Sequence, residues 1–182
     1  MSDDELAIRL RQDPELFTEV YDRHFRAIYL YVAGRLGVEP AEDIAAETFA
    51  VAFGQLGRFD PRRGTVRSWL FGIATNLVAR HRRKEARHYR MLARAQDLPS
   101  AGTHEDRVVA EVAAQRLRPQ LLTALAGLSQ GERDVVLLVG LGQLSHEEVA
   151  QALGISTGTV GSRLSRARQR LRHAISQEAV NG

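Results

Sequence analysis

The stretch SHEEVAQALGISTGTVGSRLSRARQRLR, residues 145–172, contains two short helical patterns separated by a tight turn. Ser145 is followed three residues later by Glu148, a capping box that marks the start of the first helix. Gly154 ends that helix, because glycine is the residue that most readily terminates one. The second helix carries five arginines and no acidic residue. The pattern predicts a helix-turn-helix whose last helix has a strongly basic face.

A rotation of about 100° per residue divides this last helix, capped by Ser156 or Thr157, into two faces. The apolar face, which we expect to pack against the preceding helices, consists of Val160, Leu164, Ala167, Leu171 and Ile175. The neighbouring face combines short hydroxyl side chains with long guanidinium groups: Thr159, Ser162, Arg163, Arg166 and Arg170. Arginines reach guanine edges or phosphates, and small side chains let the backbone approach the groove. The sequence therefore predicts a DNA-recognition helix.

Charge is unevenly distributed along the 182 residues, although the net charge is only +3. Residues 1–57 sum to −6 and residues 95–160 to −4, whereas residues 58–94 sum to +9 and residues 161–182 to +4. One basic block alone is usually a solvated face. Two basic blocks, each at the end of a helical unit, favour two separate contacts with a polyanion.

The front part of the chain shows helical periodicity in residues 15–36, 40–56 and 66–91, with a Gly- and Pro-containing loop, GRFDPRRGT, before the third of these. Alanine and leucine outnumber the residues that favour strands. We therefore predict an all-α protein with two small helical domains, at residues 1–92 and 118–182. Residues 93–117 are predicted to be a flexible linker.

Composition and failed motifs exclude several classes of protein. With no cysteine, the chain has neither disulfides nor thiolate metal sites. The segment HEEVA has Ala150 where a zinc protease helix needs a second histidine, and GLGQLS has Ser145 where a dinucleotide-binding loop needs a third glycine. We therefore expect no enzymatic activity, no cofactor and no metal. The acidic start MSDDELAIRL and the lack of a long apolar run predict a cytoplasmic protein without membrane insertion.

Two longer segments resemble parts of a known family. AEDIAAETFAVAFGQLGRFDPRRGTVRSWLFGIATNLVARHRRKEAR resembles region 2 of bacterial sigma factors, and LLTALAGLSQGERDVVLLVGLGQLSHEEVAQALGISTGTVGSRLSRARQRL resembles their region 4. With only a linker between them, this order is similar to that of the extracytoplasmic-function (ECF) sigma factors. The resemblance implies an RNA polymerase sigma factor that directs the core enzyme to specific promoters and initiates DNA opening.

Partners and site residues follow from the same resemblance. It implies binding to core RNA polymerase, at the largest-subunit clamp and the flap, to promoter DNA and to an anti-sigma factor. The residues implied in polymerase binding lie on the acidic second helix: Asp43, Ile44, Glu47 and Phe49. Those implied at the minus-ten element are Arg62, Arg63, Arg67, Trp69, Asn76, Arg80 and Arg83. Those implied at the minus-thirty-five element are Thr159, Ser162, Arg163, Arg166 and Arg170.

Three positions leave the interpretation open or depart from the family pattern. Trp69 matches a position at the melting face, but an aromatic residue among apolar neighbours is more often part of a core. Arg80 stands where many relatives have an acid, and Gly161 stands where they usually have Lys or Arg. The alternative function is a stand-alone helix-turn-helix repressor or activator, which would leave the basic block at residues 80–94 and the acidic helix at residues 41–53 unexplained.

Overall fold

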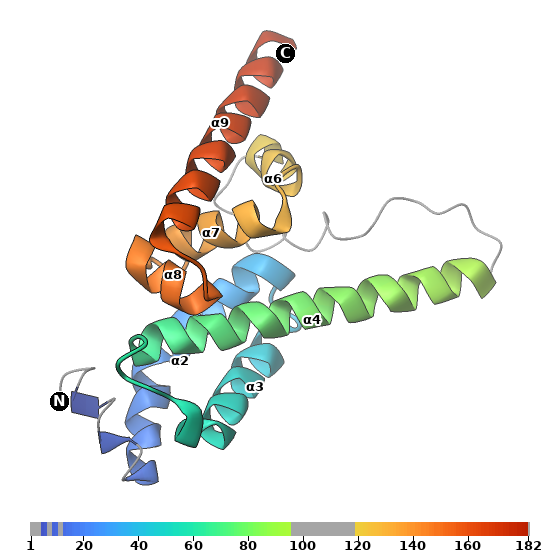
Figure 1. The fold of residues 1–182 in the computed structure, drawn as a ribbon. Helices are drawn as coiled ribbons and strands as arrows, with labels where there is room; N and C mark the ends of the chain where they lie inside the picture. Colours follow the sequence, from blue (N-terminus) through green and yellow to red (C-terminus); the bar gives the residue numbers. More distant parts are fainter. Residues whose placement is uncertain (1–4, 7–8, 11–12, 96–118, 182) are drawn as a thin grey trace.

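The computed structural model describes residues 5–6, 9–10, 13–95 and 119–181. Its elements are η1 (Pro14–Leu16), α2 (Phe17–Leu36), α3 (Ala41–Gly54), η2 (Leu56–Arg58), α4 (Val66–Ala95), α6 (Pro119–Ala126), α7 (Gln130–Gly140), α8 (His146–Leu153) and α9 (Thr157–Asn181). These described segments contain helices and no strand, which confirms the all-α prediction (Figure 1). Within them, every helix is too short or too polar to cross a bilayer.

Helices α2, α3 and α4 pack together and, with η1 and η2, form what we call the N-terminal unit. Its core consists of fully buried side chains from all three helices: Val20, Ile28, Tyr31, Val32, Ala45, Ala52, Val66, Leu70, Phe71, Ala74 and Val78. Helix α4 extends four residues beyond the predicted end at residue 91. The added residues are good helix formers without glycine or proline. Residues 96–117 of the predicted linker lie outside the described residues.

Helices α6 to α9 form the C-terminal unit, and local capping fixes where its helices begin. The boxes Ser129–Glu132 and Ser145–Glu148 both have their two reciprocal hydrogen bonds. Gly154 ends α8 with a left-handed φ of 63°, a conformation that costs glycine little. The predicted box Ser145–Glu148 and the predicted helix end at Gly154 are therefore confirmed.

Helix α9 is oriented as its two faces predicted. Its apolar face packs on the preceding helices, with Val160, Leu164 and Ala167 buried and Leu171 partly buried. The side chain of Ile175 lies outside the described residues. Of the two candidate caps, Ser156 is the one that accepts a hydrogen bond from the backbone N–H of Thr159, at 3.1 Å. Helices α8 and α9 thus form the predicted helix-turn-helix.

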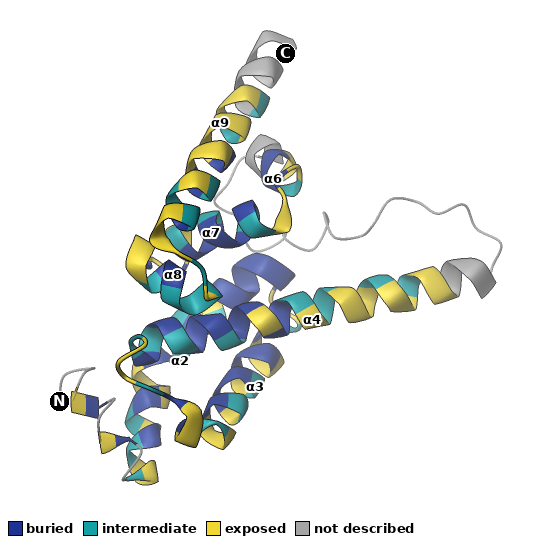
Figure 2. Ribbon diagram, viewed as in Figure 1, coloured by how far each residue is buried: buried dark blue, intermediate teal, exposed yellow. Residues whose placement is uncertain are grey.

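The two units contact each other closely, an arrangement that the sequence patterns did not predict. Helix α8 lies against α4 (Figure 1). A Cβ atom on Gly72 would lie 2.6 Å from the backbone oxygen of Ala152, so α4 and α8 can approach this closely only because residue 72 is glycine. A Cβ on Gly34 would lie 2.5 Å from Cδ1 of Leu141. The part of α4 next to α8 consists of buried and half-buried residues (Figure 2).

A charged network is buried where α2 meets α7. Arg35, with its side chain 1% exposed, pairs with Asp134 at 2.5 Å and donates to Oη of Tyr31 at 2.7 Å. Oγ1 of Thr75 donates to the carbonyl of Phe71, so the Tyr31 hydroxyl donates to Thr75 across 2.8 Å. Burial lowers the pKa of Arg35, but Tyr31 and Asp134 outweigh it and hold that pKa above its ordinary value. Arg35 is therefore charged, and its countercharge comes from the other unit.

Candidate nucleic-acid interface

The basic surface of the N-terminal unit runs from the loop before α4 along that helix. Arg62 and Arg63 are exposed in the loop, where Asp60 accepts a hydrogen bond from the backbone N–H of Arg62 at 3.0 Å. Asn76 and Arg83 are exposed on α4. Four of the seven residues implied at the minus-ten element thus present polar groups to solvent on one unit.

Arg80 and Arg67 differ from these four, because each has protein partners. Arg80, 62% exposed, forms an ion pair with Glu47 of α3. Arg67 is half-buried and reaches the C-terminal unit, where it donates to the carbonyl oxygens of Gly142 at 2.7 Å and Gln143 at 3.3 Å. One of its nitrogens also lies 3.7 Å from a carboxylate oxygen of Glu148. The guanidinium of Arg67 is thus held between the two units.

Trp69 occupies a position that agrees with both interpretations of it. Its ring is partly buried, and its centroid lies 4.9 Å from that of Phe59 at an interplanar angle of 37°. It packs at the edge of the core, whereas its neighbour Leu70 is fully buried. Trp69 also lines a cavity, so one part of the ring faces a space that another molecule can enter.

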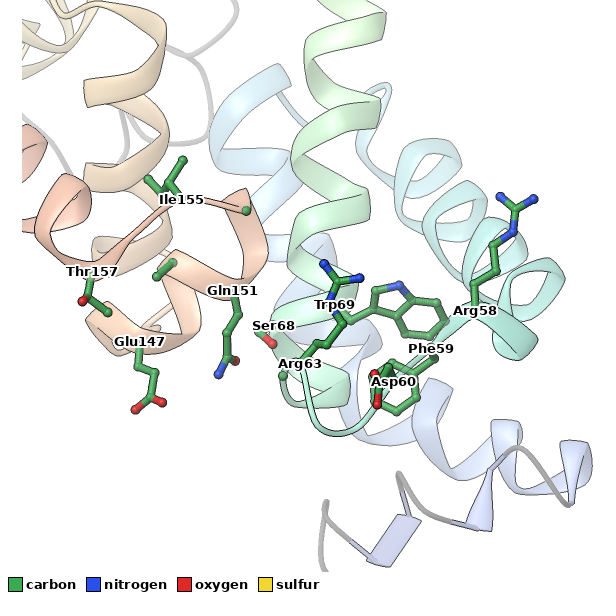
Figure 3. A pocket seen from close by; sticks show the side chains of 13 residues that line it. Arg58, Phe59, Asp60, Arg63, Ser68, Trp69, Glu147, Gln151, Ile155 and Thr157 are labelled. Atoms are coloured by element: carbon green, nitrogen blue, oxygen red, sulfur yellow. The ribbon is translucent and has the colours of Figure 1, made fainter.

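This cavity, of about 600 Å³, lies between the two units (Figure 3). The N-terminal unit contributes Arg58, Phe59, Asp60, Arg63, Gly64, Ser68 and Trp69 to its lining. The C-terminal unit contributes Glu147, Ala150, Gln151, Gly154, Ile155 and Thr157. The loop implied at the minus-ten element and the first residue of the recognition helix therefore line one cavity.

Helix α9 carries the basic surface of the C-terminal unit. Thr159 and Ser162 lie on its first turns, and the Ser162 hydroxyl donates to the carbonyl of Thr159 at 3.0 Å. Arg166 and Arg170 are exposed by 62% and 57%, and Arg163 is half-buried. The predicted arrangement of these five side chains along one helix is present in the structure.

The three arginines of this face converge on the first turn of α7. A Cβ on Gly131 would lie 3.0 Å from Cζ of Arg163, so the glycine leaves room for that guanidinium. Arg170 donates to Glu132 at 2.9 Å, and Nε of Arg166 lies 3.9 Å from the same carboxylate. The sequence analysis did not find these contacts of Glu132 with α9. A cap glutamate facing a basic helix is the signal that could have found them.

Gly161, where relatives usually have a basic residue, faces open space. Among the described residues, no heavy atom outside its own helical turn lies within 4 Å of the place a Cβ would take. Packing therefore does not require a glycine at position 161.

The four residues of the acidic helix α3 that are implied in polymerase binding form two pairs, one exposed and one buried. Asp43 is exposed and Glu47 is partly exposed, so both carboxylates can meet a partner. Ile44 and Phe49 are only 8% and 3% exposed and belong to the core. Phe49 contacts the rings of Phe17 and Tyr21, with centroids 6.3 and 4.9 Å away. These two apolar residues therefore pack α3 against the core of the N-terminal unit.

Comparison with protein families matches two parts of the chain. The model for sigma-70 region 2 matches residues 20–88, and the model for sigma-70 region 4 matches residues 118–171. Together these matches cover most of the N-terminal unit and most of the C-terminal unit.

Several characterised proteins are similar over most of the chain. The RNA polymerase sigma factor NccH of Alcaligenes xylosoxydans xylosoxydans is 33% identical, over 98% of this chain and 97% of its own length. The ECF RNA polymerase sigma factor SigW of Bacillus subtilis is 30% identical, over 90% of each chain. The ECF RNA polymerase sigma factor SigE of Mycolicibacterium smegmatis is 32% identical over 91% of this chain, which spans 62% of SigE.

Two solved structures share the fold across both units. CnrH, in complex with the cytosolic domain of CnrY, superposes with a TM-score of 0.66 and 25% identity, covering 96% of this chain and 97% of CnrH. The sigma factor RpoE of Bartonella quintana, in complex with the anti-sigma factor NepR, superposes with a TM-score of 0.62 and 25% identity, covering 88% of this chain and 96% of RpoE.

Proposed function

The chain belongs to the ECF group of sigma-70 RNA polymerase sigma factors, and we propose how its surfaces divide the work of such a factor. It directs core RNA polymerase to promoters and initiates DNA opening there. The observation that carries the division of labour is the presence of two arginine-rich surfaces, one on each unit. We propose that residues 1–92 and 118–182 act as separate promoter-binding domains joined by residues 93–117. The protein itself catalyses no reaction, and it acts with the polymerase in the bacterial cytoplasm.

The N-terminal basic surface binds the minus-ten element. Arg62, Arg63 and Arg83 are exposed cations that can follow the phosphates of a melted strand, and the exposed amide of Asn76 can read a base edge. The partly exposed ring of Trp69, next to the cavity, offers a stacking surface for an unpaired base. Arg80 joins these contacts when a phosphate replaces Glu47 as its partner.

The C-terminal basic surface reads the minus-thirty-five element as duplex DNA. Helix α9 enters the major groove with Thr159, Ser162 and Arg163 on its first turns, as recognition helices do. Arg166 and Arg170, further along the helix, reach base edges or phosphates. Because Gly161 provides no side chain at a usual family contact, the sequence preferred here should differ from that of relatives with a basic residue at this position.

Core polymerase binds the acidic side of α3. Asp43 and Glu47 offer two carboxylates about one helical turn apart, which suits a basic partner helix. Ile44 and Phe49 contribute indirectly, because they fix the orientation of α3 on the core. The largest-subunit clamp is the proposed partner of this surface, and the flap is the proposed partner of the C-terminal unit.

Promoter binding requires the two units to separate. In the structure, the minus-ten loop and the start of α9 line one cavity. The two promoter elements, by contrast, are centred about 25 base pairs apart, which is about 85 Å along B-form DNA. Arg67 must also leave the carbonyls of Gly142 and Gln143 before it can reach a phosphate. We call the observed packing of α8 on α4 the closed arrangement. It is therefore the arrangement of the protein when it is not bound to a promoter.

An anti-sigma factor is a proposed further partner. Both solved relatives were captured with another protein, which for RpoE of Bartonella quintana is the anti-sigma factor NepR. Their chains superpose on this one across both units, so the closed arrangement here suits a partner that covers both.

Run-off transcription tests the proposed function. Purified core RNA polymerase, with and without this protein, transcribes a library of genomic fragments that includes the region upstream of its own gene. We expect discrete transcripts that require the protein and whose start sites share two upstream elements. The absence of such transcripts, with the protein shifting duplex DNA by itself, would instead support the stand-alone regulator.

A further inference from the structure

We propose that Glu132 is a positioning residue for promoter reading, which holds Arg166 and Arg170 in the orientation in which they meet the minus-thirty-five element. This inference rests on the proposed function of α9. Glu132 lies on α7, outside the helix-turn-helix, and its contacts with the two arginines join α7 to α9.

The carboxylate of Glu132 is fixed by the backbone it caps. Its Oε2 accepts hydrogen bonds from the backbone N–H of Ser129 at 3.1 Å and from the Ser129 hydroxyl at 2.9 Å. The side chain is only 5% exposed, so the surrounding protein restricts its rotamer. The same Oε2 accepts a third hydrogen bond, from Nη1 of Arg170 at 2.9 Å. A rigid acceptor therefore holds a side chain that would otherwise be flexible.

The carboxylate carries its negative charge at neutral pH. Burial raises the pKa of Glu132, but the hydrogen bonds from Ser129 and the charges of Arg170 and Arg166 outweigh it and hold that pKa below its ordinary value. Hydrogen bonds to an ionised acceptor are stronger than those between neutral groups. Glu132 therefore restrains the arginines more firmly than an amide at the same position would.

The restraint leaves most of each guanidinium available to DNA. Arginine has five N–H donors in a planar fork, and the Arg170 hydrogen bond to Glu132 uses one nitrogen. Arg166 turns its Nε toward the carboxylate, at 3.9 Å, so its two terminal nitrogens remain for another partner. The side chains of Arg166 and Arg170 stay 62% and 57% exposed. Ordering them before binding lowers the entropy lost when they meet a base edge.

A purely structural cap would not need these arginines. The capping box of α8 has the same reciprocal hydrogen bonds, but its Glu148 is 19% exposed and has only Arg67 of the other unit, at 3.7 Å, beside it. Glu132 is 5% exposed and accepts a hydrogen bond at 2.9 Å from Arg170 of its own unit. Glu132 also has a neighbour, Gly131, that leaves space for a third arginine of the face, Arg163. The first turn of α7 is therefore shaped around the arginines of α9 in addition to being capped.

The test compares Glu132→Gln with Ser129→Ala in the complete holoenzyme. Glutamine can keep the capping box but removes the charge that holds the arginines. Ser129→Ala removes the hydroxyl from the cap but keeps the charge of Glu132 and its hydrogen bond from the backbone N–H of residue 129. The readout is the ratio of affinities for a promoter fragment and for the same fragment with substituted minus-thirty-five bases. Thermal unfolding of each variant reports the loss of the cap separately.

We expect Glu132→Gln to lower this specificity ratio about five- to tenfold, because one well-made base contact discriminates at about this level. Affinity for the substituted fragment should stay the same or rise, because a negative charge near the phosphates is removed. Ser129→Ala should lower the melting temperature but change the ratio by less than about twofold, because the charged carboxylate keeps its hydrogen bonds from the Ser129 backbone N–H and from Arg170. In an Arg166→Ala, Arg170→Ala background, Glu132→Gln should change the ratio no further.

An unchanged ratio in Glu132→Gln, with a melting temperature lowered as in Ser129→Ala, would reduce Glu132 to a helix cap and overturn the inference. A wild-type holoenzyme that does not discriminate between the two fragments would overturn the proposed role of α9 itself. The wild-type ratio therefore separates failure of the proposed function from failure of this inference.

Discussion

Arg67, Arg166 and Arg170 are all proposed to bind DNA, and all three have protein partners in the structure, but the partners differ. Arg67 donates to carbonyls of Gly142 and Gln143, which belong to the other unit. Arg166 and Arg170 face Glu132, which belongs to their own unit. Separation of the two units frees Arg67 and leaves the other contacts intact. Under the proposed function, the domain arrangement therefore controls the minus-ten surface, whereas contacts within the C-terminal unit order the minus-thirty-five surface in advance.

The contact between the units includes the buried ion pair Arg35–Asp134, which is sensitive to the loss of either partner. Removing one partner of a buried ion pair costs about 3–5 kcal/mol, because the remaining charge is left without compensation. When the units separate, both Arg35 and Asp134 regain water, so the pair favours the closed arrangement only modestly. An interface built on such a pair has a well-defined register but can still open.

Replacing Asp134 should produce the largest effect. In Asp134→Ala, Arg35 stays buried without its countercharge in the closed arrangement, which loses about 3–5 kcal/mol. The units should separate, and small-angle X-ray scattering should show a larger radius of gyration than for the wild type. Gly72→Ala should have the same result by a steric route, because its Cβ would lie 2.6 Å from a backbone oxygen of α8.

Gly54→Ala is the matched control for the glycine substitution. Within the described part of the chain, no heavy atom outside the local helix lies within 4 Å of the added Cβ. Its radius of gyration should equal that of the wild type. If Asp134→Ala and Gly72→Ala also kept the wild-type radius, the two units would be held together by other contacts.

Freeing Arg67 should raise the affinity of the isolated protein for single-stranded minus-ten DNA. We expect an increase of about tenfold in Asp134→Ala, because one hydrogen-bonded phosphate contact contributes about 1.4 kcal/mol. Adding Arg67→Ala to this variant should remove most of the gain in a fluorescence anisotropy titration. Affinity for duplex minus-thirty-five DNA should change less than twofold in both variants. A parallel change in the two affinities would mean that both surfaces respond to the domain arrangement.

Restoring the missing side chain on α9 should act on the C-terminal surface alone. Gly161→Arg adds one phosphate contact, so the slope of log affinity against log salt should become steeper by about 1. Gly161→Ala is the control for helix propensity and should stabilise the protein by up to about 1 kcal/mol without changing the slope. Equal slopes in wild type and Gly161→Arg would place residue 161 away from the backbone of the duplex.

The pH dependence of stability should show the smallest effect. The pKa of Glu132 is lower in the folded protein than its ordinary 4.5, so its contribution is complete above 4.5 and is lost as the pH falls through the folded value. The melting temperature of the wild type should therefore drop more steeply below about pH 4.5 than that of Glu132→Gln. Parallel melting curves from pH 6 to pH 3 would contradict the assigned charge state of Glu132.

Local features of the fold could be read from the sequence, because their determinants are close together in the chain. Each capping box joins residues three apart, and the two faces of α9 repeat within a few turns. For the same reason the recognition helix and its exposed arginines were predicted correctly as structure. Their assigned roles at DNA stay predictions that the proposed experiments address.

Long-range pairings could not be read in the same way. Nothing in the local pattern around Arg35 indicates that this charged residue is buried, because its countercharge lies on α7 in the other unit. Arg67 looked like an exposed phosphate contact for the same reason. Helical periodicity also placed Ile44 and Phe49 on α3 without showing that the core covers both.

Separation of the two units on the promoter is tested most directly by a distance measurement. The chain has no cysteine, so Thr18→Cys and Gln169→Cys, both at exposed positions, give one specific spin label on each unit. Double electron–electron resonance on the free protein should give one short, narrow distance distribution. On the complex with core polymerase and promoter DNA, the mean distance should increase by tens of ångströms, in keeping with elements about 85 Å apart. The same distance in both samples would contradict the proposal that the closed arrangement opens for promoter binding.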